Sequence, residues 1–246
     1  PTPPTPPQTK SDSPILSTQT TPPPPPVSQI RPARPPRRHL HPTAGTLEWE
    51  VLDTYKHDRA AFTQGFHAKG NVMYEGTGLY GYSELRQVNI ATGEVQKRVS
   101  LAKEKFGEGI TLMDSDTRIV QLTWKSQVGY VWDVGTFDLV REFHFDTARK
   151  EGWGITYAEK EDKLYVSDGS HFIFVWNGRT FKEERRMSVT DEKGHIVSKL
   201  NELEYYKGTI LANVWYDDRL LQINPTSGVV MKSWNFQSLV RRPQEF

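Results

Sequence analysis

The sequence of 246 residues contains no cysteine and no long apolar run. Without cysteine, disulfide bonds, thiol nucleophiles and cysteine-ligated zinc are excluded, but the redox compartment stays open because some secreted proteins also lack cysteine. No stretch approaches 18 consecutive apolar residues, so the sequence predicts no membrane-spanning helix. An excess of one charge is also missing, since 31 Lys and Arg stand against 30 Asp and Glu. This balance argues against a dedicated nucleic-acid-binding protein.

Clustered histidines and the common nucleotide and nucleophile motifs are absent as well. Histidine occurs seven times without metal-ligand spacing, at positions 39, 41, 57, 67, 144, 171 and 195. We therefore expect no catalytic transition metal, while a hard cation such as calcium beside the acidic residues 201–204 stays open. No phosphate-binding loop is present. The sequence Ser167-Asp168-Gly169-Ser170 is interpreted as a turn, because no strand–elbow–helix context surrounds its serines.

Proline is concentrated in residues 1–46, which include five consecutive prolines from Pro22 to Pro26. Apolar side chains are too few there to offset the entropy of ordering, so we predict a disordered linker. The linker ends in a basic group, which we interpret as solvated rather than as a binding patch: Arg31, Arg34, Arg37 and Arg38. Because the chain starts with Pro1, we expect it to be a piece or a processed form of a longer protein.

Residues 47–246 have the sequence pattern of an all-β domain. Short alternating apolar segments predict strands at residues 72–74, 119–122, 163–166 and 210–214. No segment keeps a helical period of 3.6 residues over more than about ten positions.

Two series of recurring residues reveal a repeat. Glycines in similar segments are separated by 44 residues from Gly65 to Gly109 and by 45 residues from there to Gly154. A fourth copy aligns at Leu203, which is 49 residues farther on. A polar residue that ends a strand recurs at Asn89, Asp133, Asn177 and Asn224, and further strands are predicted at residues 94–100, 139–145, 182–189 and 229–236. A period in the mid-forties with four strands in each unit indicates a β-propeller.

The number of blades is open between two alternatives. Four repeats extend from about Phe62 to Phe236, and a spare strand is predicted over residues 47–55. The ring has either four blades and an extra strand, or five blades with roughly one repeat missing from this sequence. We favour five blades, because the spare strand would otherwise be an unpaired edge.

Glu108 is the first candidate for chemistry. It lies between two glycines on the innermost strand of its repeat, which lines the channel of a propeller. A carboxyl group near tryptophans at the channel mouth has a raised pKa and transfers protons at neutral pH. From the pattern alone, the interpretation of Glu108 as a polar channel residue bonded to backbone amides is favoured over the catalytic one.

Tryptophans supply the second clue. Trp124, Trp153 and Trp215 lie at ends of first or second strands, where they would form an apolar pocket or pack blade against blade. We assign the remaining tryptophans to packing: Trp49, Trp132, Trp176 and Trp234.

Six motifs together resemble the glutaminyl cyclases of the plant (papaya) and bacterial type. The motifs are Phe62-Thr63-Gln64-Gly65-Phe66, Glu75-Gly76-Thr77-Gly78-Leu79-Tyr80-Gly81, Phe106-Gly107-Glu108-Gly109-Ile110-Thr111, Gly152-Trp153-Gly154, Ser167-Asp168-Gly169-Ser170 and Asn201-Glu202-Leu203-Glu204-Tyr205. The resemblance covers about residues 47–240. It implies a five-bladed propeller that converts N-terminal glutamine of peptides and proteins to pyroglutamate and releases ammonia.

The resemblance also implies roles for individual residues. Glu108 is the proton shuttle, and the substrate pocket consists of Phe62, Gln64, Phe106, Trp124, Trp153, Asn201 and Trp215. We expect no required cofactor, a monomer, and a secretory, envelope or extracellular location. One departure is that the family's fifth blade carries a site lysine in a Thr-Gly-Lys type motif that this sequence does not reach.

Two other functions stay open. The first is a propeller without catalytic activity that binds peptides or proteins across its face, although such a scaffold has no need for Glu108 among tryptophans. The second is a hydrolase with a channel metal, which would need four or more convergent ligands.

Overall fold

The computed structural model describes residues 49–239. The predicted linker over residues 1–46 lies outside this range, as do the four arginines at its end. The described residues form strands and turns and contain no helix. The strands, in chain order, are β1 (Thr63–Lys69), β2 (Val72–Thr77), β3 (Glu84–Asn89), β4 (Val95–Ser100), β5 (Gly107–Met113), β6 (Arg118–Thr123), β7 (Val128–Asp133), β8 (Leu139–His144), β9 (Ile155–Ala158), β10 (Lys163–Ser167), β11 (Phe172–Asn177), β12 (Glu183–Ser188), β13 (Leu200–Tyr206), β14 (Thr209–Val214), β15 (Arg219–Ile223) and β16 (Val230–Asn235).

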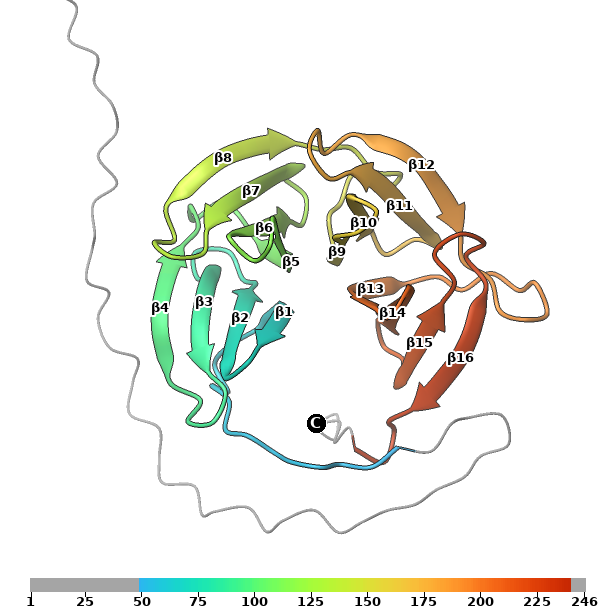
Figure 1. The fold of residues 1–246 in the computed structure, drawn as a ribbon, viewed down its shortest axis with the longest axis horizontal. Helices are drawn as coiled ribbons and strands as arrows, with labels where there is room; N and C mark the ends of the chain where they lie inside the picture. The colour runs from blue at the N-terminus through green and yellow to red at the C-terminus, as the bar shows by residue number, and fades with distance from the viewer. Residues whose placement is uncertain (1–48, 240–246) are drawn as a thin grey trace, which may run out of the picture. The chain divides into compact units, whose positions relative to one another are not determined.

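These strands form four antiparallel sheets of four consecutive strands each. We number the sheets as blades 1 to 4, from β1–β4 to β13–β16. Figure 1 shows them around a central axis, with the first strand of each blade innermost and the fourth outermost. The predicted all-β propeller is confirmed. Five blades are not, since the part of the chain that the structure describes contains four.

The repeat found in the sequence corresponds to a repeated turn. The polar residue that ends each third strand accepts hydrogen bonds through its side-chain oxygen from backbone amides of the turn that follows. Asp133 Oδ1 accepts from the amides of Gly135 and Thr136, and Asn177 Oδ1 accepts from two amides in the same way. Such Asx turns fix the short connection to the fourth strand. The predicted strands match their observed counterparts to within a residue or two, except that the one predicted at residues 72–74 ends three residues before β2 does.

The spare strand predicted over residues 47–55 is not observed over residues 49–55, which pair with no sheet. Instead the Trp49 indole N–H donates to the carbonyl oxygen of Asn235 at 2.7 Å, and its ring lies 5.2 Å from that of Phe236. The segment runs between the end of blade 4 and the start of blade 1 (Figure 1). A strand needs a neighbour for its backbone groups, and none of the four blades offers one there.

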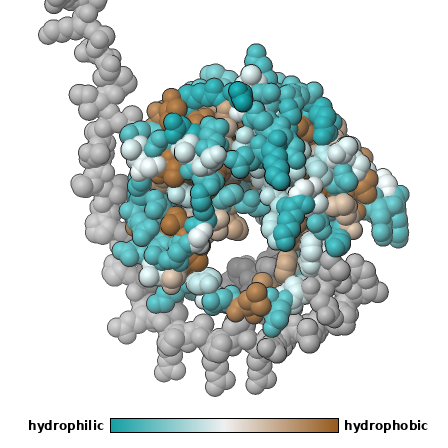
Figure 2. Space-filling model, viewed as in Figure 1, coloured by the Kyte–Doolittle hydropathy of each residue, from teal (hydrophilic) through white to brown (hydrophobic). Residues whose placement is uncertain are grey.

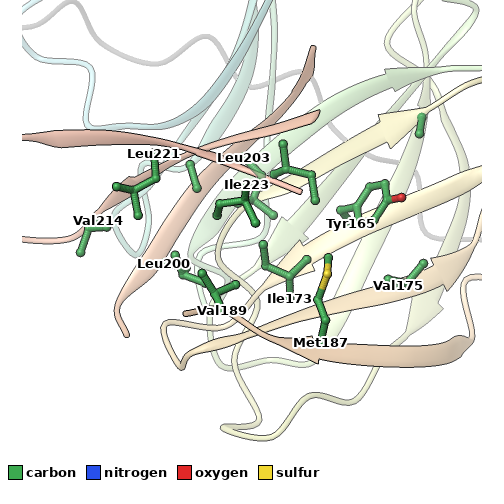
Figure 3. Packing of buried hydrophobic residues seen from close by; sticks show 13 residues of the cluster. Tyr165, Ile173, Val175, Met187, Val189, Leu200, Leu203, Val214, Leu221 and Ile223 are labelled. Carbon is green, nitrogen blue, oxygen red and sulfur yellow. The ribbon is translucent and has the colours of Figure 1, made fainter. Parts of the chain in front are cut away.

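Three apolar clusters lie between successive blades. The cluster between blades 3 and 4 includes Ile173 and Leu203, both buried, and Figure 3 shows its side chains converging from both sheets. On β11, Ile173 and Val175 belong to this cluster, whereas Phe174 and Trp176 face blade 2. Successive residues of a strand point to opposite faces of its sheet. A blade that packs against a neighbour on each face therefore needs apolar residues at consecutive positions. The face seen in Figure 2 is mostly hydrophilic over the described residues and surrounds a central opening.

Candidate active site

Every candidate residue lies at the same end of the blades. This end carries the starts of the first strands and the ends of the second strands. Gln64 and Glu108 are the second residues of β1 and β5, whereas Trp124 and Trp215 directly follow β6 and β14. The other candidates are in equivalent places at the starts of first strands: Phe62, Phe106, Trp153 and Asn201.

A β-bulge interrupts the first strand at three of these positions. The register shifts between Thr63 and Gly65 in β1, so that Gln64 has no direct partner. The same shift occurs between Gly107 and Ile110 in β5, around Glu108, and between Leu200 and Leu203 in β13, around Asn201. Bulges re-aim side chains and are frequent beside active sites. They therefore break the alternation at the three polar candidates.

The aromatic candidates form two connected groups. The Phe106 ring lies 6.3 Å from that of Phe62 and 5.5 Å from that of Trp124. Trp153 and Trp215 meet edge to face at 5.4 Å. Exposed aromatic residues extend each group outward, since the Tyr80 ring lies 5.4 Å from Phe106 and the Tyr216 ring lies 4.4 Å from Trp215. We call these rings together the aromatic wall.

Glu151 joins the two groups. Its Oε2 atom accepts hydrogen bonds at 2.9 Å from the indole N–H of Trp124 and at 2.9 Å from that of Trp153. A single carboxyl oxygen thus holds the pocket tryptophans of blades 2 and 3 together. The sequence analysis missed Glu151. Its position two residues before Trp153, outside every strand, was the available signal.

Glycine makes room for the wall in the other two blades. A Cβ atom on Gly78 would lie 2.4 Å from the Phe106 ring, and one on Gly169 would lie 2.5 Å from the Trp153 ring. Gly78 directly follows β2, at the position where blades 2 and 4 carry Trp124 and Trp215, whereas Gly169 is the second residue after β10. In blades 1 and 3 a glycine after the second strand therefore leaves room for an aromatic ring.

Glu108 is buried, with only 6% of its surface exposed. Burial raises its pKa well above the ordinary value of 4.5, and the negative charge of Glu151 raises it further. Within residues 49–239 the Glu108 carboxyl group makes no hydrogen bond to protein, so it is free to exchange protons with a bound molecule.

Further along the channel lie two more carboxyl groups. Both carboxylate oxygens of Glu202 are buried without a hydrogen-bond partner within the described chain, next to Gly65 and Gly109. Burial raises the pKa of Glu202 well above 4.5, and the charges of Glu204 and Glu108 add to the effect. Burial also raises the pKa of Glu204 to about 7.

The channel carboxyl groups do not assemble into a metal centre. Over residues 49–239, no group of three or more His, Asp or Glu side chains is placed to hold a metal ion. Glu204 faces His67, whose Nδ1 lies 3.6 Å from Glu204 Oε1. That part of the chain also contains no helix long and apolar enough to cross a membrane.

The glutamine cyclotransferase family model matches residues 29–245. The chain belongs to this family. A glutaminyl-peptide cyclotransferase of Arabidopsis thaliana is 35% identical over 201 residues, which are 79% of this chain and 59% of the plant protein. The crystal structure of the Myxococcus xanthus glutaminyl cyclase superposes with a TM-score of 0.69 at 27% identity, covering 79% of this chain and 82% of the bacterial one.

These comparisons confirm the resemblance found in the motifs. The chain spans about three fifths of the plant relative's length, given the 59% coverage. The roles of its individual residues are therefore argued from the geometry described above.

Proposed function

We propose that this chain cyclises N-terminal glutamine of peptides and proteins to pyroglutamate. The observation that carries the proposal is Glu108, a buried carboxyl group with a raised pKa at the start of the innermost strand, beside the aromatic wall. The Arabidopsis and Myxococcus relatives bear the names of this activity.

The reaction needs orientation and one proton carrier. The neutral α-amine of the substrate attacks the amide carbon of its own glutamine side chain, and a C–N bond forms. Ionised Glu108 takes the proton that the amine loses and then gives it to the side-chain amide nitrogen. The bond between the amide carbon and this nitrogen then breaks, and ammonia leaves. A raised pKa suits this role, because the carboxylate is then a stronger base and the acid forms readily near neutral pH.

The pocket residues hold the reacting groups in place. We assign Gln64 and Asn201 to hydrogen bonds with the substrate amide, because bulges turn both out of the regular ladder. The rings of Phe62, Phe106 and Trp215 exclude water from the reacting atoms, which strengthens electrostatic interactions within the site.

A Glu108→Gln variant tests the proposal. We expect ammonia release from a short peptide with N-terminal glutamine to fall by a factor of 100 or more, on the order of what a positioned acid–base group contributes. Coupled detection of ammonia measures the rate. The matched control is Glu142→Gln, which removes a carboxyl group from the exposed strand β8 and should leave the rate unchanged.

Two results would contradict the proposal. If the folded parent binds the peptide without releasing ammonia, the chain is a binding propeller. If Glu108→Gln keeps full activity, the proton passes through another group. The expectation that the reaction needs no cofactor stays a prediction, and a structural calcium ion in the channel stays open.

We further propose that the complete ring has five blades. Each pair of successive blades shares an apolar cluster, but none joins blade 4 to blade 1 within the described residues. Phe66 on the innermost strand of blade 1 is 48% exposed, which is unusual for a channel strand and fits a missing neighbour. The exchange experiment in the Discussion tests this arrangement.

A further inference from the structure

The segment that joins β8 to β9 contains an acidic residue for which the reaction described above has no role. Glu151 lies between the two groups of the aromatic wall, and its Oε2 atom accepts the indole N–H groups of both Trp124 and Trp153 at 2.9 Å. We propose that Glu151 is a positioning residue: it fixes both indoles with one oxygen and places a negative charge beside Glu108. The inference rests on the proposed function and adds a residue to it.

The backbone around Glu151 is held rigidly. The Thr147 hydroxyl donates to the Glu151 carbonyl at 2.7 Å and accepts from the Glu151 amide at 3.1 Å. The fully buried Asp168 accepts from the amide of Arg149 at 2.8 Å. A side chain on such a closed loop has few alternative positions, so the two indole hydrogen bonds cost little entropy to form.

The two indoles come from different blades. Trp124 directly follows the second strand of blade 2, whereas Trp153 precedes the first strand of blade 3. Without an acceptor between them, both N–H groups would point into a partly apolar pocket, where an unpaired donor is costly. A shared acceptor therefore sets the width of the pocket between blades.

The charge of Glu151 acts on Glu108. Among groups that face Glu108, Glu151 contributes a negative charge that raises the Glu108 pKa. Glu202 on β13 also interacts electrostatically with Glu108. In the same loop as Trp124, the Lys125 Nζ lies 3.9 Å from the centre of the Trp124 ring, while His67 faces Glu204 farther along β1.

Three variants separate position from charge. Glu151→Gln keeps an oxygen that accepts both indole N–H groups but removes the charge. Glu151→Asp keeps the charge but shortens the side chain. Asp146→Asn removes an exposed charge from the same segment and leaves the pocket untouched, so it is the matched control.

The first measurement is the pH dependence of kcat/KM for ammonia release. Removing the charge lowers the Glu108 pKa, so more Glu108 is ionised at acidic pH. The ratio of kcat/KM in Glu151→Gln to that in the parent should therefore rise as pH falls, because the substrate amine contributes equally to both. Asp146→Asn should give a constant ratio. Glu151→Asp should keep the parent's pH dependence but lose about tenfold in kcat/KM through displaced indoles.

The second measurement does not depend on activity. In protein labelled with ¹³C at glutamate carboxyl groups, the Glu108 titration should move to lower pH in Glu151→Gln and stay in place in Asp146→Asn. The indole N–H signals of Trp124 and Trp153 should both shift in Glu151→Asp.

The outcomes are distinct. An unchanged Glu108 titration in Glu151→Gln, or a shift of only one indole signal, overturns the inference whether or not the parent is active. If the signals move as expected but the parent releases no ammonia, the inference stands and the proposed function is wrong.

Discussion

At the scale of single residues, the carboxyl groups in the channel differ in their surroundings. Glu108 lies beside the charge of Glu151, whereas Glu202 has both oxygens buried without a partner among the described residues. A buried carboxylate that lacks a partner is costly, and the group lowers this cost by staying protonated. We therefore expect Glu202 to be neutral in the folded protein over a wide range of pH.

Glu202→Gln should stabilise the protein as pH rises. Burial raises the pKa of Glu202 above its ordinary value of 4.5, so ionising this carboxyl group costs free energy in the folded state. The contribution of protonated Glu202 to the free energy of unfolding is intact below the pKa that the group has in the unfolded state. It is lost as pH increases toward the pKa in the folded state. The Tm difference between variant and parent should thus grow between about pH 4 and pH 8, as thermal melts would measure.

An exposed carboxyl group provides the control. Glu142→Gln on β8 should shift Tm equally at both pH values. A Glu202→Gln variant that melts below the parent at pH 8 would instead show that ionised Glu202 has a partner in solution. A calcium ion in the channel, which the sequence leaves open, would be the first partner to test, by adding a chelator to the parent.

Not all of these residues were equally accessible from sequence. Glu108 was found because glycines flank it in a recurring motif. Glu151 was missed because its role depends on two indoles from different blades, and neither spacing nor alternation encodes that meeting. The burial of Glu202 follows from Gly65 and Gly109 on neighbouring strands, which leave room for its carboxylate.

At the scale of strands and loops, the repeat predicted most of the blades. Alternation and the Asn or Asp turn fixed the second, third and fourth strands. The alternation pattern failed where the first strands bulge. Leu200 and Leu203 both lie in one core cluster, although residues three apart on a regular strand point to opposite faces. A bulge is a response to neighbouring strands and so leaves little trace in one segment's pattern.

Gly169→Ala should disrupt the aromatic wall. Its φ of +75° disfavours any side chain, and the added Cβ would meet the Trp153 ring at 2.5 Å. We expect a loss of about 1–2 kcal/mol beyond the backbone strain itself, as in other overpacked sites. Urea unfolding followed by tryptophan fluorescence measures both the stability and the ring's environment.

Gly194→Ala isolates the backbone contribution. Gly194 has a similar φ of +84°, but a Cβ there meets no atom within 4 Å. Equal stability losses in the two variants, with unchanged fluorescence, would show that the indole moves aside freely and that Gly169 does not shape the wall.

At the scale of the whole molecule, the apolar clusters join each blade only to its neighbours along the chain, although Glu202 of blade 4 also lies against Gly65 and Gly109 in the channel. Blades 2 and 3 each bury both faces, whereas blades 1 and 4 each contribute to one of the three clusters. In such a one-dimensional stack, stability is a sum of unit and interface contributions. The spare strand was predicted wrongly because the sequence repeat locates the blades but does not show how the ring closes. Closure of the ring depends on whether the first and last blades contact each other.

Amide hydrogen exchange should reveal whether the ring is open. If blades 1 and 4 each lack a neighbour, local opening costs less there, and β2 and β14 should exchange faster than β6 and β10. In a ring with a fifth blade, both open faces would be covered and the four second strands would exchange at similar rates. A strand within residues 49–55 would then become protected. Mass spectrometry of peptides from each second strand separates the cases. Faster exchange in the end blades would support the five-bladed proposal, because it shows that blades 1 and 4 each lack a neighbour that a fifth blade would supply. Uniform protection of the four strands would show that blades 1 and 4 already cover each other and would contradict the proposal.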